Sequence, residues 1–218
     1  HGKGLITWSN GDRYDGDWLA GNRHGKGVYT WGSGGRYEGD WVDNKRNGRG
    51  IYIGKNKSGE TYRYEGPFVD GKFHGKGLMT WSNGDRYDGD FVNDSRTGKG
   101  IYHGKNNEGI KYRYEGDFLD NVFAGKGVMT WSNGERYEGG YANDMRNGKG
   151  VYTWPSGSRY EGDFVDGKRT GKGVYTWPSG ASYVGDFLNE VRTGYGVYRF
   201  PDGRELRGRF ENNEYLGP

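Results

Sequence analysis

The chain has 218 residues with 32 basic and 29 acidic side chains, a formal net charge of +3, and no cysteine. Hydrophobic residues make up only 31% of it, whereas 45 residues are glycine and 17% are aromatic. The near-balanced charge argues against a nucleic-acid partner, and the missing cysteines exclude disulfides, Cys-based zinc sites and thiol nucleophiles. Scarce apolar residues concentrated in large rings favour a thin structure in which each unit packs only on its neighbours.

A repeating unit runs along the whole chain, with starts 23 or 27 residues apart. Each unit opens with the pattern Tyr-x-Gly-x-aromatic, in which Leu206 replaces the tyrosine of the last unit. The chain begins inside a unit, which suggests that it is a piece of a longer protein, and the polar last unit is typical of a capping repeat. We infer one array with units at residues 1–13, 14–36, 37–63, 64–86, 87–113, 114–136, 137–159, 160–182, 183–205 and 206–218.

Each unit predicts a β-hairpin. In residues 36–42, Tyr37, Gly39 and Trp41 alternate with charged residues, and residues 27–31 alternate in the same way. Helical periodicity is absent, and this glycine density is unfavourable to helices. We therefore predict an all-β fold: an elongated, single-layer antiparallel sheet of tandem β-hairpins, a solenoid that is twisted and curved, with no helical domain. The aromatic rings should lie over glycines and form the core.

Two kinds of turn separate the strands. Polar turns such as residues 43–48 join the two strands of a unit. Turns such as Ser-Asn-Gly-Asp at residues 9–12 join successive units, and Asn-Gly is a strong hairpin signal because both residues tolerate positive φ.

Two units of 27 residues depart from the pattern. Both lose the usual tryptophan, and both should project a longer loop rich in lysine and asparagine. The unit after each one has Phe73 or Phe123 in a turn where the other units have arginine, and no packing requirement for a phenylalanine is evident there. These deviations are particular to this protein, so they are the sharper candidates for a working surface.

The most regular stretch, YEGDFVDGKRTGKGVYTWPSG at residues 160–180, resembles the MORN motif, the membrane occupation and recognition nexus repeat. The resemblance extends over essentially the whole chain. It implies an elongated array of hairpins with a curved groove and a binding or scaffolding role. It also implies a cytoplasmic place in a cytoskeletal, ciliary or membrane-contact assembly, at the periphery of a membrane in some members.

Our leading hypothesis is a non-enzymatic scaffold that binds a helical or extended segment of a partner protein along the aromatic face. The alternative for each ring is a purely structural place in the core. We also predict that a homodimer or end-to-end assembly can form. The candidate partner-binding residues are Trp18, Trp41, Phe68, Phe91, Phe118, Tyr141, Phe164, Phe187, Phe73 and Phe123, and the candidate loop contacts are Lys55, Asn56, Lys57, Lys105, Asn106 and Asn107.

Basic residues recur in two rows, which leaves an anionic phospholipid membrane open as an alternative partner. Arginines precede the unit-starting tyrosines, and Arg36 shares a strand face with Glu38 and Asp40, so charge pairing between strands is the structural explanation. The lysines of the Gly-Lys-Gly pattern form the other row, and the candidates for lipid contact are Lys26, Lys76, Lys99, Lys126, Lys149 and Lys172.

No pattern of residues predicts catalysis. Gly-Lys-Gly lacks the spacing of a phosphate-binding loop, and three of the four histidines, His1, His24 and His74, fill the same turn position in different units, which argues against a metal cluster. Each carboxylate belongs to a repeated row, and no nucleophile, base and orienting group stand together. We therefore expect no enzyme activity, no cofactor and no metal, although a regulatory module of a larger enzyme stays open.

Overall fold

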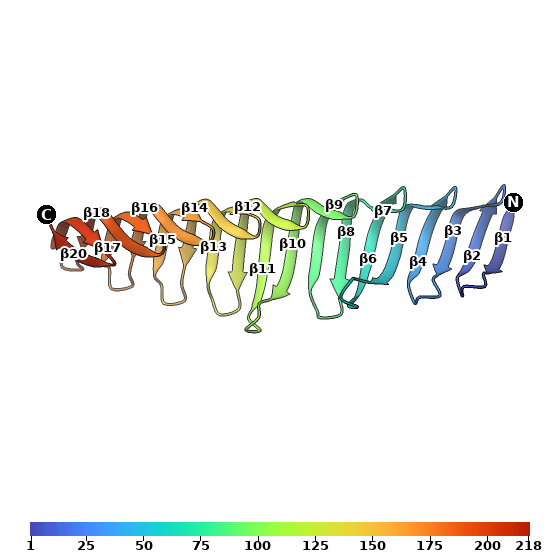
Figure 1. Cartoon of the computed structure of the whole chain (residues 1–218), viewed down its shortest axis with the longest axis horizontal. Helices are drawn as coiled ribbons and strands as arrows, with labels where there is room; N and C mark the ends of the chain where they lie inside the picture. The colour runs from blue at the N-terminus through green and yellow to red at the C-terminus, as the bar shows by residue number, and fades with distance from the viewer. The chain divides into compact units, whose positions relative to one another are not determined.

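The computed structural model describes all residues 1–218, and the chain is all-β, with twenty strands in antiparallel pairings and no helix. It divides into two compact units, residues 1–104 with 119–121 and residues 105–118 with 122–218. Within each unit, consecutive strands follow one another in hairpin order (Figure 1). This confirms the predicted all-β fold of tandem hairpins.

The first unit contains essentially these strands: β1 (Gly2–Thr7), β2 (Arg13–Leu19), β3 (Asn22–Thr30), β4 (Arg36–Val42), β5 (Lys45–Lys55), β6 (Thr61–Val69), β7 (Lys72–Phe73), β8 (Gly75–Trp81), β9 (Arg86–Val92) and β10 (Ser95–Lys105). The second contains β11 (Lys111–Leu119), β12 (Val122–Trp131), β13 (Arg136–Ala142), β14 (Met145–Thr153), β15 (Arg159–Val165), β16 (Lys168–Thr176), β17 (Ser182–Leu188), β18 (Val191–Arg199), β19 (Glu205–Glu211) and β20 (Glu214–Gly217).

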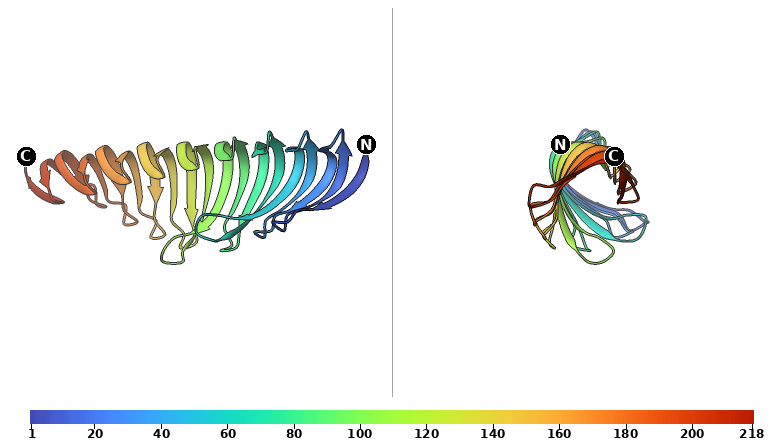
Figure 2. Two further views of the ribbon diagram at one scale, coloured as in Figure 1. Left: turned by 45° about the vertical axis from the view of Figure 1, so that its right-hand side comes forward. Right: turned by 90° about the vertical axis from the view of Figure 1, so that its left-hand side faces the viewer.

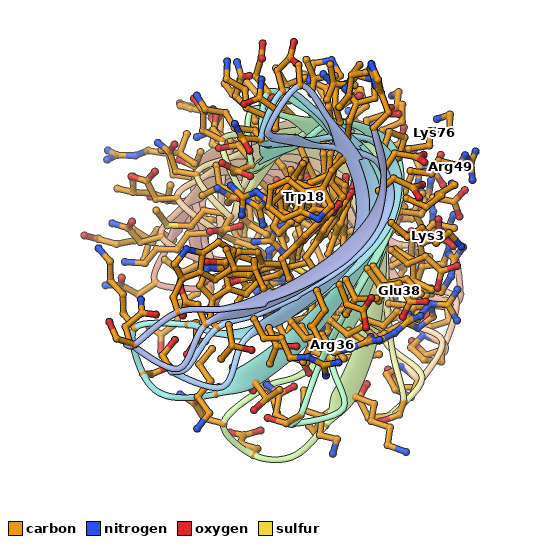
Figure 3. All side chains as sticks on the ribbon, turned by 90° about the vertical axis from the view of Figure 1, so that its right-hand side faces the viewer. Lys3, Trp18, Arg36, Glu38, Arg49 and Lys76 are labelled. Carbon is orange, nitrogen blue, oxygen red and sulfur yellow. The ribbon has the colours of Figure 1, made fainter.

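The strands of the first unit are bent, so its sheet has an inner and an outer face (Figure 2). Period-two alternation sends the rings to the inner face and the charged residues to the outer one. Figure 3 shows Trp18 inside the curve, with Lys3, Glu38 and Arg49 on the outside. The core is therefore one layer of side chains on the inner face.

That core is built from tyrosine rings lying over glycines. The pairing register places Gly39 opposite Gly50, and a Cβ atom on Gly50 would lie only 2.4 Å from the ring of Tyr37. The Tyr37 hydroxyl donates to the carbonyl oxygen of Asp40 at 2.9 Å, so the buried phenol keeps a hydrogen bond. The same place is filled by eight completely buried tyrosines, Tyr14, Tyr37, Tyr64, Tyr87, Tyr114, Tyr137, Tyr160 and Tyr183.

Most of these rings link their own repeat to the next one. Tyr37 meets Trp41 of its own repeat with ring centres 5.2 Å apart and Phe68 of the following repeat at 4.9 Å, both edge to face. Edge-to-face contacts of this kind add to the free energy gained by burial. The prediction of a core of rings lying over glycines is confirmed.

The turns differ in detail from the sequence-based expectation. The turn inside the second repeat has only two residues, Asp43 and Asn44, because β5 already begins at Lys45. Both residues have positive φ, 45° and 69°, as a type I′ hairpin turn requires. In the Asn-Gly turns between repeats only the glycine has positive φ, 86° at Gly11, while the Asn10 side chain accepts the Asp12 N–H at 3.1 Å.

Candidate functional site

The rings predicted to contact a partner lie mostly inside the core. Trp41 is 3% exposed and Phe68 is 1% exposed, and the equivalent rings Phe91, Phe118, Tyr141, Phe164 and Phe187 are buried as well. Only Trp18, in the first repeat, is half-buried. Little ring surface in this row is left for a partner, so any inner-face contact has to use side chains outside it.

A second row of rings lies closer to solvent on the inner face. It comes from the end of the second strand of each repeat and the residue after it. In the first unit, Tyr52 of β5 and Trp31, directly after β3, are examples, and both are half-buried. They contact one another with ring centres 5.6 Å apart. The sequence-based list of candidates did not include this row.

An arginine covers the rings in most repeats. The guanidinium carbon of Arg23 lies 4.9 Å from the ring centre of Tyr29 and 4.6 Å from that of Trp41. The same guanidinium donates to the carbonyl oxygen of Asn44, in the turn of the next repeat, at 3.1 Å. These contacts combine cation–π attraction with a hydrogen bond that fixes neighbouring repeats to each other. Equivalent arginines are Arg46, Arg96, Arg146, Arg169 and Arg192.

Phe73 and Phe123 occupy this arginine position, and the structure corrects the expectation that no packing requires them. Phe73 is 7% exposed and stacks on Tyr64 with ring centres 4.1 Å apart. Phe123 stacks on Tyr114 in the same way at 4.0 Å. Each phenylalanine therefore covers a unit-starting tyrosine, so its first role is in the core.

The exchange of arginine for phenylalanine is accompanied by two further exchanges. The position that Tyr29 holds in the repeat of Arg23 is a methionine in the two phenylalanine repeats. It is Met79 in the repeat of Phe73 and Met129 in the repeat of Phe123. The residue in the next turn that accepts the backbone N–H of this position also changes. Asp94 accepts the Phe73 N–H at 2.8 Å, and Asp144 accepts the Phe123 N–H at 2.7 Å. The joint change of three positions is a sequence signal that would have pointed to these two places.

A hollow of about 390 Å³ opens on the inner face of the first unit beside Phe73. Its walls come from β5, β6, β7 and β8 and from the adjoining turns. It is lined by three half-buried rings, the buried Phe73 and Met79, one asparagine and two charged residues: Tyr52, Tyr62, Trp81, Phe73, Met79, Asn56, Arg46 and Asp94. Burial, together with the neighbouring Tyr52, raises the pKa of Tyr62 to about 12, so its hydroxyl stays a proton donor at neutral pH.

The extra residues of the long repeats form the longer element that we expected, but as paired strands and not as an open loop. They lengthen the hairpin, because Gly54 still pairs with Tyr62 and Lys55 with Thr61. The remaining turn is closed by Asn56, whose side chain accepts the Glu60 N–H at 2.9 Å. Lys55 and Lys57 are exposed beside it, and Lys105, Asn106 and Asn107 are exposed in the second long repeat. Of these loop candidates only Asn56 borders the hollow.

The basic rows are largely neutralised on the outer face. The arginines pair with the carboxylate two residues further along the same strand, as Arg36 does with Glu38 at 2.6 Å. The lysines pair across strands at 2.5 to 2.9 Å, in the pairs Lys26–Asp40, Lys76–Asp90, Lys149–Asp163 and Lys172–Asp186. Charge pairing thus accounts for most of both rows.

The lysine row is interrupted where the opposite residue is not an aspartate. Arg49 stands opposite Pro67, and Lys126 stands opposite Gly140. In regular repeats the aspartate also accepts a backbone N–H across the bulge, as Asp40 does from Arg49 at 2.8 Å. A groove of about 600 Å³ runs over this part of the outer face, with glycine backbone in its floor and Lys3, Lys26 and Arg49 among its lining residues.

No three histidine, aspartate or glutamate side chains lie close enough to hold a metal ion. The strongest pKa shifts are upward shifts of buried tyrosines that act as core residues, caused first by burial. No segment forms a helix that is long and apolar enough to cross a membrane.

The hairpin order, the tyrosine-over-glycine core and the repeated contacts between neighbours define a β-hairpin repeat protein of the solenoid type. The MORN repeat model matches residues 1–13, 14–36, 37–59, 64–86, 87–108, 114–136, 137–159, 160–182 and 183–203. The chain therefore belongs to the MORN repeat family. No curated protein matches the sequence.

Two solved structures are similar to the chain at low identity. The TCP10 domain of Danio rerio CPAP, in complex with a peptide of Danio rerio STIL, is 12% identical with a TM-score of 0.49 over 96% of this chain and 93% of that one. The TCP domain of Drosophila melanogaster SAS-4 (dCPAP), in complex with a proline-rich motif of Ana2 (dSTIL), is 13% identical with a TM-score of 0.38 over 94% and 88%. Both likenesses are too distant to support an argument about function.

Proposed function

We propose that the chain is a non-enzymatic protein-interaction module that binds a helical or extended segment of a partner protein on its inner face. The observation that carries the proposal is the hollow beside Phe73. There, half-buried aromatic side chains surround a space of about 390 Å³, whereas regular repeats cover the rings of their inner face with their own arginines, as Arg23 and Arg146 do. Aromatic anchors around a concavity are typical of the centre of a protein interface.

The charges of the outer face favour this proposal over binding to an anionic membrane. Most lysines and arginines of that face already have a carboxylate within salt-bridge distance, which lowers the net positive field that a lipid surface would meet. The place of the module in a cytoskeletal, ciliary or membrane-contact assembly, as the family resemblance implies, belongs to the same proposal.

Site-specific photo-crosslinking tests the proposal. A photoreactive phenylalanine analogue replaces Tyr62 in the hollow, and the matched control carries it at Glu38, which lies on the outer face of the same unit (Figure 3). A captured protein is then purified and titrated. We expect saturable binding with cross-links only from position 62. Cross-links from position 38 alone, or no saturable partner for either variant, would overturn the proposal.

A further inference from the structure

The repeats provide an internal comparison of charge at the arginine position. In six repeats an arginine places its guanidinium over the rings. In three of the six, the backbone N–H of this arginine donates to a neutral side chain in the next turn, that of Asn44, Asn121 or Asn213. In a fourth, Glu190 receives it and pairs with the guanidinium of Arg169 at 2.5 Å. In the two phenylalanine repeats the cation is missing, and the receiving residue is a carboxylate. The local charge is therefore reversed at these two places.

The carboxylate of Asp94 is not needed for the hydrogen bond that it makes. One oxygen, Oδ1, accepts the Phe73 N–H at 2.8 Å, a bond that Asn44 makes equally well with the Arg23 N–H at 2.9 Å. Asp94 is exposed and forms no ion pair with any residue of the chain. Its negative charge thus stands at the edge of the hollow, and Arg46, the cation that also lines the hollow, forms no ion pair with it.

The rings beside Asp94 suit a positive charge. Tyr52, Tyr62 and Trp81 line the hollow and are half-buried, so part of each ring remains accessible. A cation near aromatic faces is attracted by the ring quadrupole, and Met79 adds a polarisable thioether. The cation on the wall, Arg46, is already engaged, since it donates to the Gly71 carbonyl and lies 5.0 Å from the ring centre of Tyr52 and 5.3 Å from that of Phe68.

We propose that this hollow binds a cationic side chain, the guanidinium or ammonium group of an arginine or lysine in the partner segment. The partner would supply the charge that the regular repeats supply themselves, with Asp94 as its counter-ion and the rings of Tyr62 and Trp81 as its walls. The proposal rests on the proposed interaction function and deepens it by naming the chemistry of one anchor. The same set recurs in the second unit, where Phe123, Met129 and Asp144 hold the equivalent positions.

A small probe tests the site directly. The intact chain is titrated with N-acetyl-arginine amide at millimolar concentrations, while the indole N–H signal of Trp81 is followed by NMR; N-acetyl-citrulline amide, which is neutral and nearly the same shape, is the matched control. We expect a saturable shift with the arginine probe and an affinity at least about fivefold lower for the citrulline probe, as the loss of one partly screened ion pair with its cation–π contact predicts.

The variant Asp94→Asn separates charge from structure, because asparagine keeps the acceptor for the Phe73 N–H. We expect it to unfold at the same urea concentration as the wild type and to bind the arginine probe about fivefold more weakly. The double variant Phe73→Arg with Asp94→Asn restores the pattern of the regular repeats and should abolish the shift. Equal binding of both probes, no saturable shift, or unchanged binding by Asp94→Asn would overturn the inference.

The partner obtained by photo-crosslinking keeps the two proposals distinguishable. If the purified partner binds wild type and Asp94→Asn equally well, the interaction function stands and the cationic anchor is wrong. If the chain has no saturable partner but the arginine probe binds in a manner that depends on Asp94, the interaction function is wrong and the cation site stands.

Discussion

Replacing Gly50 by alanine should be among the most damaging single-methyl additions to this protein. The new Cβ would lie 2.4 to 2.6 Å from three atoms of Tyr37, whereas carbon atoms in contact normally lie about 3.5–4.0 Å apart. The ring would have to move by about 1 Å, away from a site where it is completely buried. Overpacking costs about 1–3 kcal/mol, and moving the ring weakens the 2.9 Å bond from its hydroxyl to Asp40, worth about 1 kcal/mol. We therefore expect Gly50→Ala to lower the free energy of unfolding by about 2–4 kcal/mol.

The matched control is Gly4→Ala, at the same place in the pattern but in the first strand, where no preceding tyrosine lies over it. Its Cβ would meet only the half-buried Trp18, at 3.0 Å. We therefore expect the free energy of unfolding to fall by less than about 1 kcal/mol. Urea unfolding followed by tryptophan fluorescence measures both. Equal losses for the two variants would refute the argument that rings over glycines form the core.

Two further predictions concern charge. Burial raises the pKa of Tyr14, Tyr64 and Tyr137 to about 12, above the ordinary value of about 10, so the unfolded chain loses these protons at lower pH than the folded chain does. The free energy of unfolding should therefore be constant below pH ~10 and fall progressively towards pH ~12. Urea midpoints measured against pH test this, and a flat profile over that range would contradict it. The variant Pro67→Asp should restore both an ion pair with Arg49 and an acceptor for the Lys76 N–H. We therefore expect this variant to be about 1 kcal/mol more stable to urea than Pro67→Ala. The reverse order would show that the aspartate at the bulge contributes nothing to stability.

The sequence predicted the fold because its period is strict. Tyr37, Gly39 and Trp41 share a strand face in any antiparallel hairpin, and a single-layer sheet has nothing but such rings to bury. The turns were harder to predict. The pattern of residues 43–48 suggested a long polar turn, but a type I′ turn needs only two residues with positive φ, and the remaining residues join the strand.

The candidate site was predicted only in part. Phe73 and the long repeat beside it were singled out, yet Phe73 contributes mainly a buried ring, and the accessible surface comes from Tyr52, Tyr62 and Trp81. Single positions could not show this, because the hollow depends on which side chain covers a ring in the next strand. The correlated change of Arg to Phe, Tyr to Met and Asn to Asp carries that information.

The most direct test of the account compares two adjacent residues of β6. Tyr62 faces the hollow, whereas Arg63 pairs with Glu65 on the outer face. The purified partner is titrated by calorimetry against Tyr62→Ala and Arg63→Ala. Binding on the inner face predicts that Tyr62→Ala raises Kd by at least about tenfold while Arg63→Ala leaves it within about twofold. The opposite order, or equal effects, would contradict it.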